Sequence, residues 1–249
     1  MTQRSGANTE KDASASPTGP ANSAAVPSAS PATERITEGV TEPVTAPVAA
    51  PITGALTELL SGTSTISVED YVTQLADSRE AVSAPANRIV EELIAHKPEL
   101  LAPHIETLVG LLASPRSRAV HIAAQALPVL ARVAPAKVAK HLKTMQAAFP
   151  AASELAKDGL VRTFVALCVA SVTYQKRLIE NFELALRTAD AKQLPGWVEH
   201  ILPALKGEPY AQARSVVEQR LNDPALDRAV AQRVADTIGV KLRALPDRK

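Results

Sequence analysis

From residue 67 onward, the sequence is a succession of segments with apolar residues at helical spacing. In HIETLVGLL, for example, Ile105, Leu108, Val109 and Leu112 follow the pattern i, i+3, i+4, i+7 of an amphipathic helix. Prolines recur near the starts of these segments, where the missing N–H would have no helical partner in any case. The sequence predicts ten helices, over about residues 68–78, 83–97, 99–113, 116–133, 135–148, 152–173, 175–189, 191–206, 208–222 and 225–244.

Taken in pairs, the predicted helices recur with a period. The pairs start at about residues 68, 99, 135, 175 and 208, so consecutive starts differ by about 31, 36, 40 and 33 residues. A period in this range indicates helical hairpins that bury their apolar faces by stacking on their neighbours. Residues 159–172 fit the second helix of such a hairpin, because their apolar side chains are spread around the helix. We therefore predict an all-α, right-handed α-solenoid of about five hairpins.

One layer of this solenoid resembles a known repeat. The segment IETLVGLLASPRSRAVHIAAQALPVLARVAP, residues 105–135, is similar to a HEAT repeat, in which a leucine-rich helix leads through a short turn into V-x-x-A-A-x-A-L. The residues that match this pattern are Val120, Ala123, Ala124, Ala126 and Leu127. His121 stands where the family usually has arginine. The resemblance implies five HEAT-like hairpins whose paired helices approach closely through small residues, with the second helices lining a concave surface. Tetratricopeptide repeats need aromatic positions that this chain lacks.

The first 66 residues differ in composition from the rest. They are rich in Ala, Pro, Ser and Thr and contain no aromatic residue, so we expect a disordered arm over 1–66 and a HEAT-like domain over 67–249. The arm has 3 basic and 6 acidic side chains, a net charge of −3. Residues 37–52 form the tetrapeptides TEGV, TEPV, TAPV and AAPI, which suit either an extended spacer or a docking motif. The following GALTELLSG could form a short helix that caps the first layer.

The sequence contains no motif that indicates catalysis. Gly-rich phosphate loops, a GxSxG elbow, an HExxH helix and a CxxC pair are all missing, so we expect no enzyme activity, cofactor or metal. Cys168 is the single cysteine and lies in an apolar segment, which favours a buried thiol in a reducing compartment. No apolar stretch reaches the length of a membrane span, and the N-terminal residues do not resemble a secretory signal. We expect a cytoplasmic protein.

The candidate binding residues come from a basic region and a lone tryptophan. Between Glu106 and Glu154 there is no acidic residue, and the cations of this stretch are Arg116, Arg118, Arg132, Lys137, Lys140 and Lys143. His121 lies among them, and Trp197, in LPGWVEHILPAL, has two interpretations, a core residue or an exposed anchor for a partner.

These residues suit two functions. The first is a non-catalytic scaffold or adaptor that binds a protein partner on its concave surface. The alternative is a nucleic-acid-binding protein that uses the basic region of residues 114–145. A solvated helix face is the third interpretation of the same cations.

Overall fold

The computed structural model describes residues 54–224 and 226–242, all of which belong to one compact unit spanning residues 48–249. The tetrapeptide repeat and most of the expected arm lie outside these residues. The described chain contains helices and no strand: α1 (Gly54–Ser61), α2 (Val68–Gln74), α3 (Glu80–His96), η1 (Pro98–His104), α4 (Ile105–Leu111), α5 (Ser117–Val133), α6 (Pro135–Lys140), α7 (Leu142–Ala148), η2 (Phe149–Ala151), α8 (Glu154–Ala170), α9 (Thr173–Thr188), α10 (Gln193–Ala204), α11 (Glu208–Leu221) and α12 (Arg228–Ile238).

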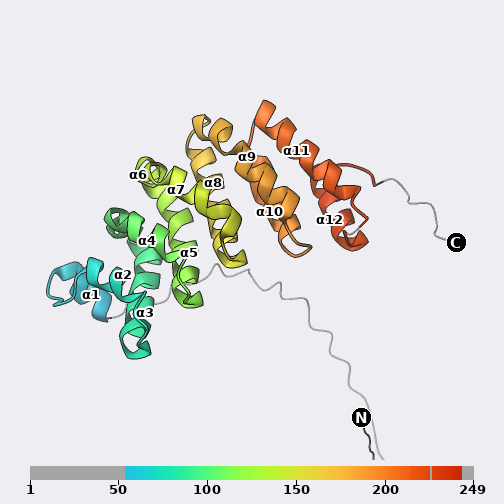
Figure 1. The fold of residues 1–249 in the computed structure, drawn as a ribbon. Coiled ribbons are helices and arrows are strands. Elements are labelled where there is room, and N and C mark those ends of the chain that lie inside the picture. The colour runs from blue at the N-terminus through green and yellow to red at the C-terminus, as the bar shows by residue number, and fades with distance from the viewer. Residues whose placement is uncertain (1–53, 225, 243–249) are drawn as a thin grey trace, which may run out of the picture. The chain divides into compact units, whose positions relative to one another are not determined.

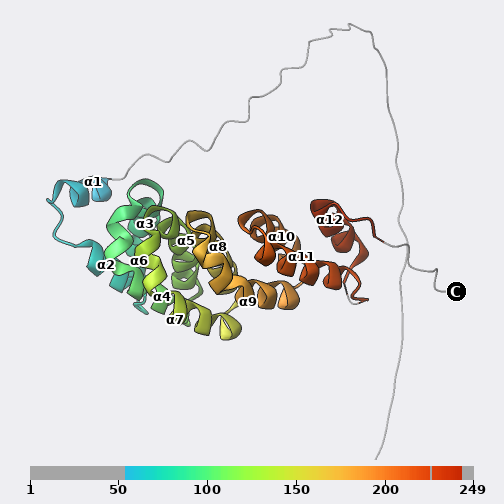
Figure 2. The ribbon, with the colours of Figure 1, turned by 90° about the horizontal axis from the view of Figure 1, so that it is seen from above.

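The helices form two parallel rows (Figures 1 and 2). The first row contains the first helix of each hairpin, namely α2, η1 with α4, α6 with α7, α9 and α11. The second row contains α3, α5, α8, α10 and α12, and each of these helices packs on the next. In Figure 2 the second row lies on the inner side of the curve. Within residues 54–242 the pairs make five hairpins, so the predicted all-α solenoid is confirmed.

Two predicted helices are each split in two. The helix expected over 99–113 begins as the 3-10 helix η1, which contains Pro103, and becomes α-helical only from Ile105. Proline has no N–H to donate within a helix and its ring crowds the preceding turn, which favours this change of geometry. The helix expected over 135–148 is divided between Lys140 and Leu142, where the His141 N–H bonds the Val138 carbonyl at 3.0 Å in a tighter turn.

The short helix expected in GALTELLSG is present as α1. It packs against α3 and its Leu56 is fully buried in the common core. The packed residues therefore begin before position 67, within the segment that the sequence assigned to the arm.

The core lies between the two rows of helices and also between neighbouring helices of the second row. Leu160, Val161, Phe164 and Leu167 of α8 are fully buried, because this helix is covered by α9 and by its second-row neighbours α5 and α10. All three phenylalanines are buried too. Phe164 stands between Phe149 and Phe182, with ring centroids 6.2 and 6.4 Å apart, so that one aromatic chain joins consecutive hairpins.

Helices α5 and α8 are in close contact at Gly159. A Cβ atom at this position would lie 2.5 Å from the Ala124 Cβ and 2.6 Å from the Ala124 Cα. Ala124 belongs to the alanine pattern that the sequence assigned to contact within one hairpin. The structure shows that this alanine makes room for the second helix of the next hairpin instead.

Candidate binding groove on the second-helix row

The structure divides the predicted basic region between the two rows. Lys137, Lys140 and Lys143 are exposed on α6 and α7, in the first row. Arg118, His121 and Arg132 lie on α5, in the second row, and Arg116 is the residue that precedes this helix. The cations that are neighbours in sequence therefore do not make one continuous surface.

Arg116 and Arg118 are engaged in contacts between helices α5 and α3. The Arg116 Nη2 donates to the Ser83 hydroxyl at 3.0 Å, and this arginine is only partly exposed. The Arg118 Nη2 lies 2.6 Å from the Glu91 Oε1. Both side chains connect α5 to α3, so part of their guanidinium hydrogen-bond donors already have partners within the fold.

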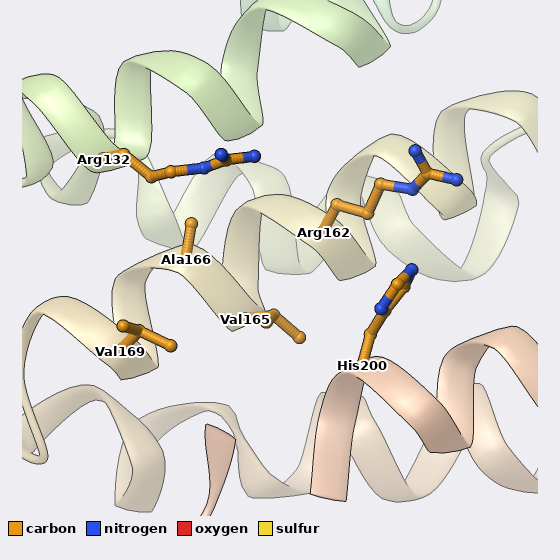
Figure 3. Close-up of a pocket in the computed structure, with 6 residues that line it drawn as sticks. All are labelled: Arg132, Arg162, Val165, Ala166, Val169 and His200. Carbon is orange, nitrogen blue, oxygen red and sulfur yellow. The ribbon is translucent and has the colours of Figure 1, made fainter. Parts of the chain in front are cut away.

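Two adjoining pockets form a groove along the second row. The central pocket, of about 280 Å³, is lined by Arg132, Arg162, Val165, Ala166, Val169 and His200 (Figure 3). The neighbouring pocket, of about 400 Å³, is lined by Ile94, His121, Ala124, Gln125, Pro128, Val129, Arg132, Leu155, Asp158 and Arg162. Arg132 and Arg162 line both, so we treat the two pockets as one groove that runs across α3, α5, α8 and α10.

The groove combines cations with exposed aliphatic side chains. Arg132 makes no hydrogen bond or ion pair with any described residue, and the same holds for the ring nitrogens of His200. Val169 is 73% exposed and lies one residue before the end of α8. Val165 lies one turn before it on the same face of α8. The central pocket therefore presents free hydrogen-bond donors beside an apolar wall.

Asp158 positions Arg162 from the adjoining pocket. Its Oδ2 accepts from the Arg162 Nε at 3.0 Å, and its Oδ1 accepts from the Trp197 Nε1 at 3.1 Å. The Trp197 side chain is 2% exposed, so of its two predicted roles it fills the core one, and its indole N–H holds Asp158 in place. Nε is used in this way, whereas the two Nη groups of Arg162 form no hydrogen bond with a described residue, and in the view of Figure 3 the guanidinium extends away from Arg132.

Sequence reasoning missed five groove residues, namely Asp158, Arg162, Val165, Val169 and His200. One signal was present. Asp158 and Arg162 are four residues apart in the most apolar predicted helix, where a charged pair marks the side that does not face the core. His121, which the sequence did single out, lines the neighbouring pocket and bonds Gln125 at 3.0 Å.

The described residues contain no group of three or more His, Cys, Asp or Glu side chains that could hold a metal ion. Cys168 is buried, and burial raises the pKa of its thiol to about 12, so the thiol stays protonated at neutral pH. Within the same residues, no helix has both the length and the apolar character that a membrane crossing requires.

No protein-family model and no curated protein matches the sequence. Among solved structures, an engineered protein, Northeast Structural Genomics Consortium target OR329, is similar at a TM-score of 0.52 and 18% identity, over 77% of this chain and 85% of that chain. A computationally designed armadillo repeat protein for modular peptide recognition is similar at a TM-score of 0.50 and 18% identity, over 74% of this chain and 84% of that chain. At this identity the likeness shows the fold, a solenoid of helical repeats.

Proposed function

We propose that this protein is a non-catalytic scaffold or adaptor that binds a segment of a partner protein along the second-helix row. The observation that carries the proposal is the groove itself. It crosses four successive second helices and offers Arg132, which has no partner among the described residues, beside the exposed Val169. A surface with free donors and exposed aliphatic groups suits a polypeptide, which presents polar backbone groups and side chains of both kinds.

The type of repeat is part of the same proposal. Hairpins such as α9 with α10 have two helices, as HEAT repeats do, and α5 contains the small-residue pattern that resembles that family. The hairpins that contain η1 with α4 and α6 with α7 have a divided first helix, which brings them closer to the three helices of an armadillo repeat. We therefore describe the repeats as HEAT-like. The likeness to a design for modular peptide recognition is in keeping with a peptide-binding groove.

The nucleic-acid alternative receives less support from the arrangement of charges. A phosphate backbone needs a track of cations on one surface. Lys137, Lys140 and Lys143 lie on the first row, away from Arg132 and Arg162 on the second. The cations of residues 114–145 are thus shared between two surfaces.

Affinity capture from a native lysate, using the full chain as bait, tests the proposal. We expect a protein partner that withstands nuclease and is lost when Val165→Gln and Val169→Gln are combined, because the groove then loses its apolar wall. The matched control is Leu60→Gln with Leu100→Gln, which alters two exposed leucines elsewhere. The function is refuted if nuclease removes every partner or if the groove variant retains them all while its melting curve shows that it is folded.

A further inference from the structure

We propose that the central pocket of the groove recognises a carboxylate of the bound peptide together with a neighbouring aliphatic side chain. The ligand class is an acidic–aliphatic segment, with Asp or Glu close to Val, Leu or Ile. This inference rests on the proposed function and names what the partner must present at one place in the groove.

The hydrogen-bond donors of the pocket suit a carboxylate. Among the described residues, the two Nη groups of Arg162 have no partner, because Asp158 binds only its Nε, at 3.0 Å. Arg132 enters the same pocket from α5 with its whole guanidinium unpaired among the described residues, and His200 enters from α10 (Figure 3). A guanidinium presents paired N–H groups that match the two oxygens of a carboxylate, and such hydrogen bonds are stronger than neutral ones.

The local charges compensate this cationic character only in part, through the Asp158–Arg162 ion pair. The six described side chains that line the central pocket include no carboxylate. The two acids nearest in sequence to its lining residues already have partners. Asp158 accepts from both Arg162 and Trp197, and Glu199 pairs with Arg233 at 3.0 Å. An arriving carboxylate would therefore meet cations without competing against a free acidic side chain.

The apolar wall of the pocket indicates that the ligand also presents an aliphatic side chain. Val165, Ala166 and Val169 line the pocket along α8, and Val169 is exposed to 73%. These residues offer no hydrogen bond to a sugar or a phosphate chain, and contact with an apolar side chain would remove them from water. Arg162 and Val165 lie three residues apart on the same helix face, so a charged and an apolar group of one extended peptide can be bound together.

Selection from a library of random 12-residue peptides displayed on phage tests this specificity, with the full chain as target. We expect the enriched peptides to carry Asp or Glu close to an aliphatic residue. Arg132→Gln should weaken their binding about tenfold, since it removes a charge-assisted hydrogen bond to the peptide. The substitution should leave the fold intact, because the Arg132 side chain has no partner among the described residues. Lys137→Gln is the matched control. It removes one exposed cation from the first row and should leave binding unchanged.

Trp197 supplies a second measurement, because it is the single tryptophan and gives one indole N–H resonance. Its Nε1 is joined to Arg162 through Asp158, so occupation of the Arg162 donors should shift this resonance. We expect the strongest enriched peptide to cause the shift and its Glu→Gln version to cause none at the same concentration.

The outcomes separate the two proposals. Enriched peptides that need Val165 and Val169 but contain no acid, or that bind Arg132→Gln as tightly as the original chain, overturn the carboxylate site and leave the scaffold function standing. If no enriched peptide depends on any groove residue, both proposals are overturned.

Discussion

Gly159→Ala tests how the second-helix row is assembled. The new Cβ would lie 2.5 Å from the Ala124 Cβ, 2.6 Å from its Cα and 2.9 Å from its carbonyl oxygen. Two of these three atoms belong to the α5 backbone, so no change of rotamer can relieve the contact. The two helices must separate by about 1 Å to restore ordinary contact distances, and gaps of that size forfeit a large part of the local dispersion energy.

The expected magnitude follows from two opposing effects. Replacing a helical glycine by alanine favours the helix by about 1 kcal/mol. Overpacking a tight interface destabilises by about 1–3 kcal/mol, and a clash with backbone belongs at or above the upper end of this range. We therefore expect Gly159→Ala to lower the free energy of unfolding by about 2 kcal/mol.

Urea unfolding followed by circular dichroism measures this change. Gly196→Ala in α10 is the control, because a Cβ there would meet nothing within 4 Å, and it should be neutral or stabilising by up to about 1 kcal/mol. Adding Ala124→Gly to Gly159→Ala should not restore stability, because the contacts with the Ala124 Cα and carbonyl oxygen remain and a glycine inside α5 costs about 1 kcal/mol. A Gly159→Ala protein that is as stable as the original chain would show that the helices are not in close contact at this point.

Three further predictions concern stability and reactivity. Gln175 is 2% exposed, and its amide donates to the Ala204 carbonyl at 2.9 Å and accepts from the Lys206 N–H at 3.1 Å, so Gln175→Ala should lower the urea midpoint by an amount that corresponds to about 2 kcal/mol. Cys168 should not react with a thiol reagent at pH 8 in the native protein and should react fully in urea, because burial raises its thiol pKa to about 12. Hydrogen bonds from Ser67 lower the pKa of Asp70, and those from Arg79 lower that of Asp77 to about 2, so both stabilise the fold above about pH 4. Stability should fall as the pH drops from 4 towards 2, and less steeply in Asp77→Asn, when urea midpoints are compared across that range.

Much of the fold could be predicted from the sequence, because each helix has local signals. The helix predicted over 116–133 is observed as Ser117–Val133, and the one over 208–222 as Glu208–Leu221. The last helix, predicted over 225–244, is shorter and is observed as Arg228–Ile238. The Asp227 carboxylate accepts from the Ala229 and Val230 N–H groups at its start, and Gly239, whose φ is 68°, caps its end. What the apolar pattern did not show is the division of first helices, since η1 and α4 share one face and differ only in backbone geometry.

The groove was harder to predict because it is made by stacking. Arg132, Arg162 and His200 are about thirty to forty residues apart in sequence, and each lies on a different second helix. The periodicity of apolar residues within one helix shows which side faces the core. It does not show which residues of neighbouring hairpins lie next to each other in space. For the same reason Lys137 is grouped with Arg132 by sequence distance, although the turn between two consecutive hairpins places them on different rows.

Helix α8 connects this stacking to the binding site. On one side Gly159 contacts α5 of the preceding hairpin, and on the other the adjacent Asp158 accepts the indole N–H of Trp197 in the following hairpin. The direction of the Arg162 side chain therefore depends on three hairpins at once. It follows that two substitutions near the groove should act differently. Gly159→Ala should lower both stability and peptide affinity, because it separates the helices that hold Arg132 and Arg162, whereas Arg132→Gln should lower affinity alone.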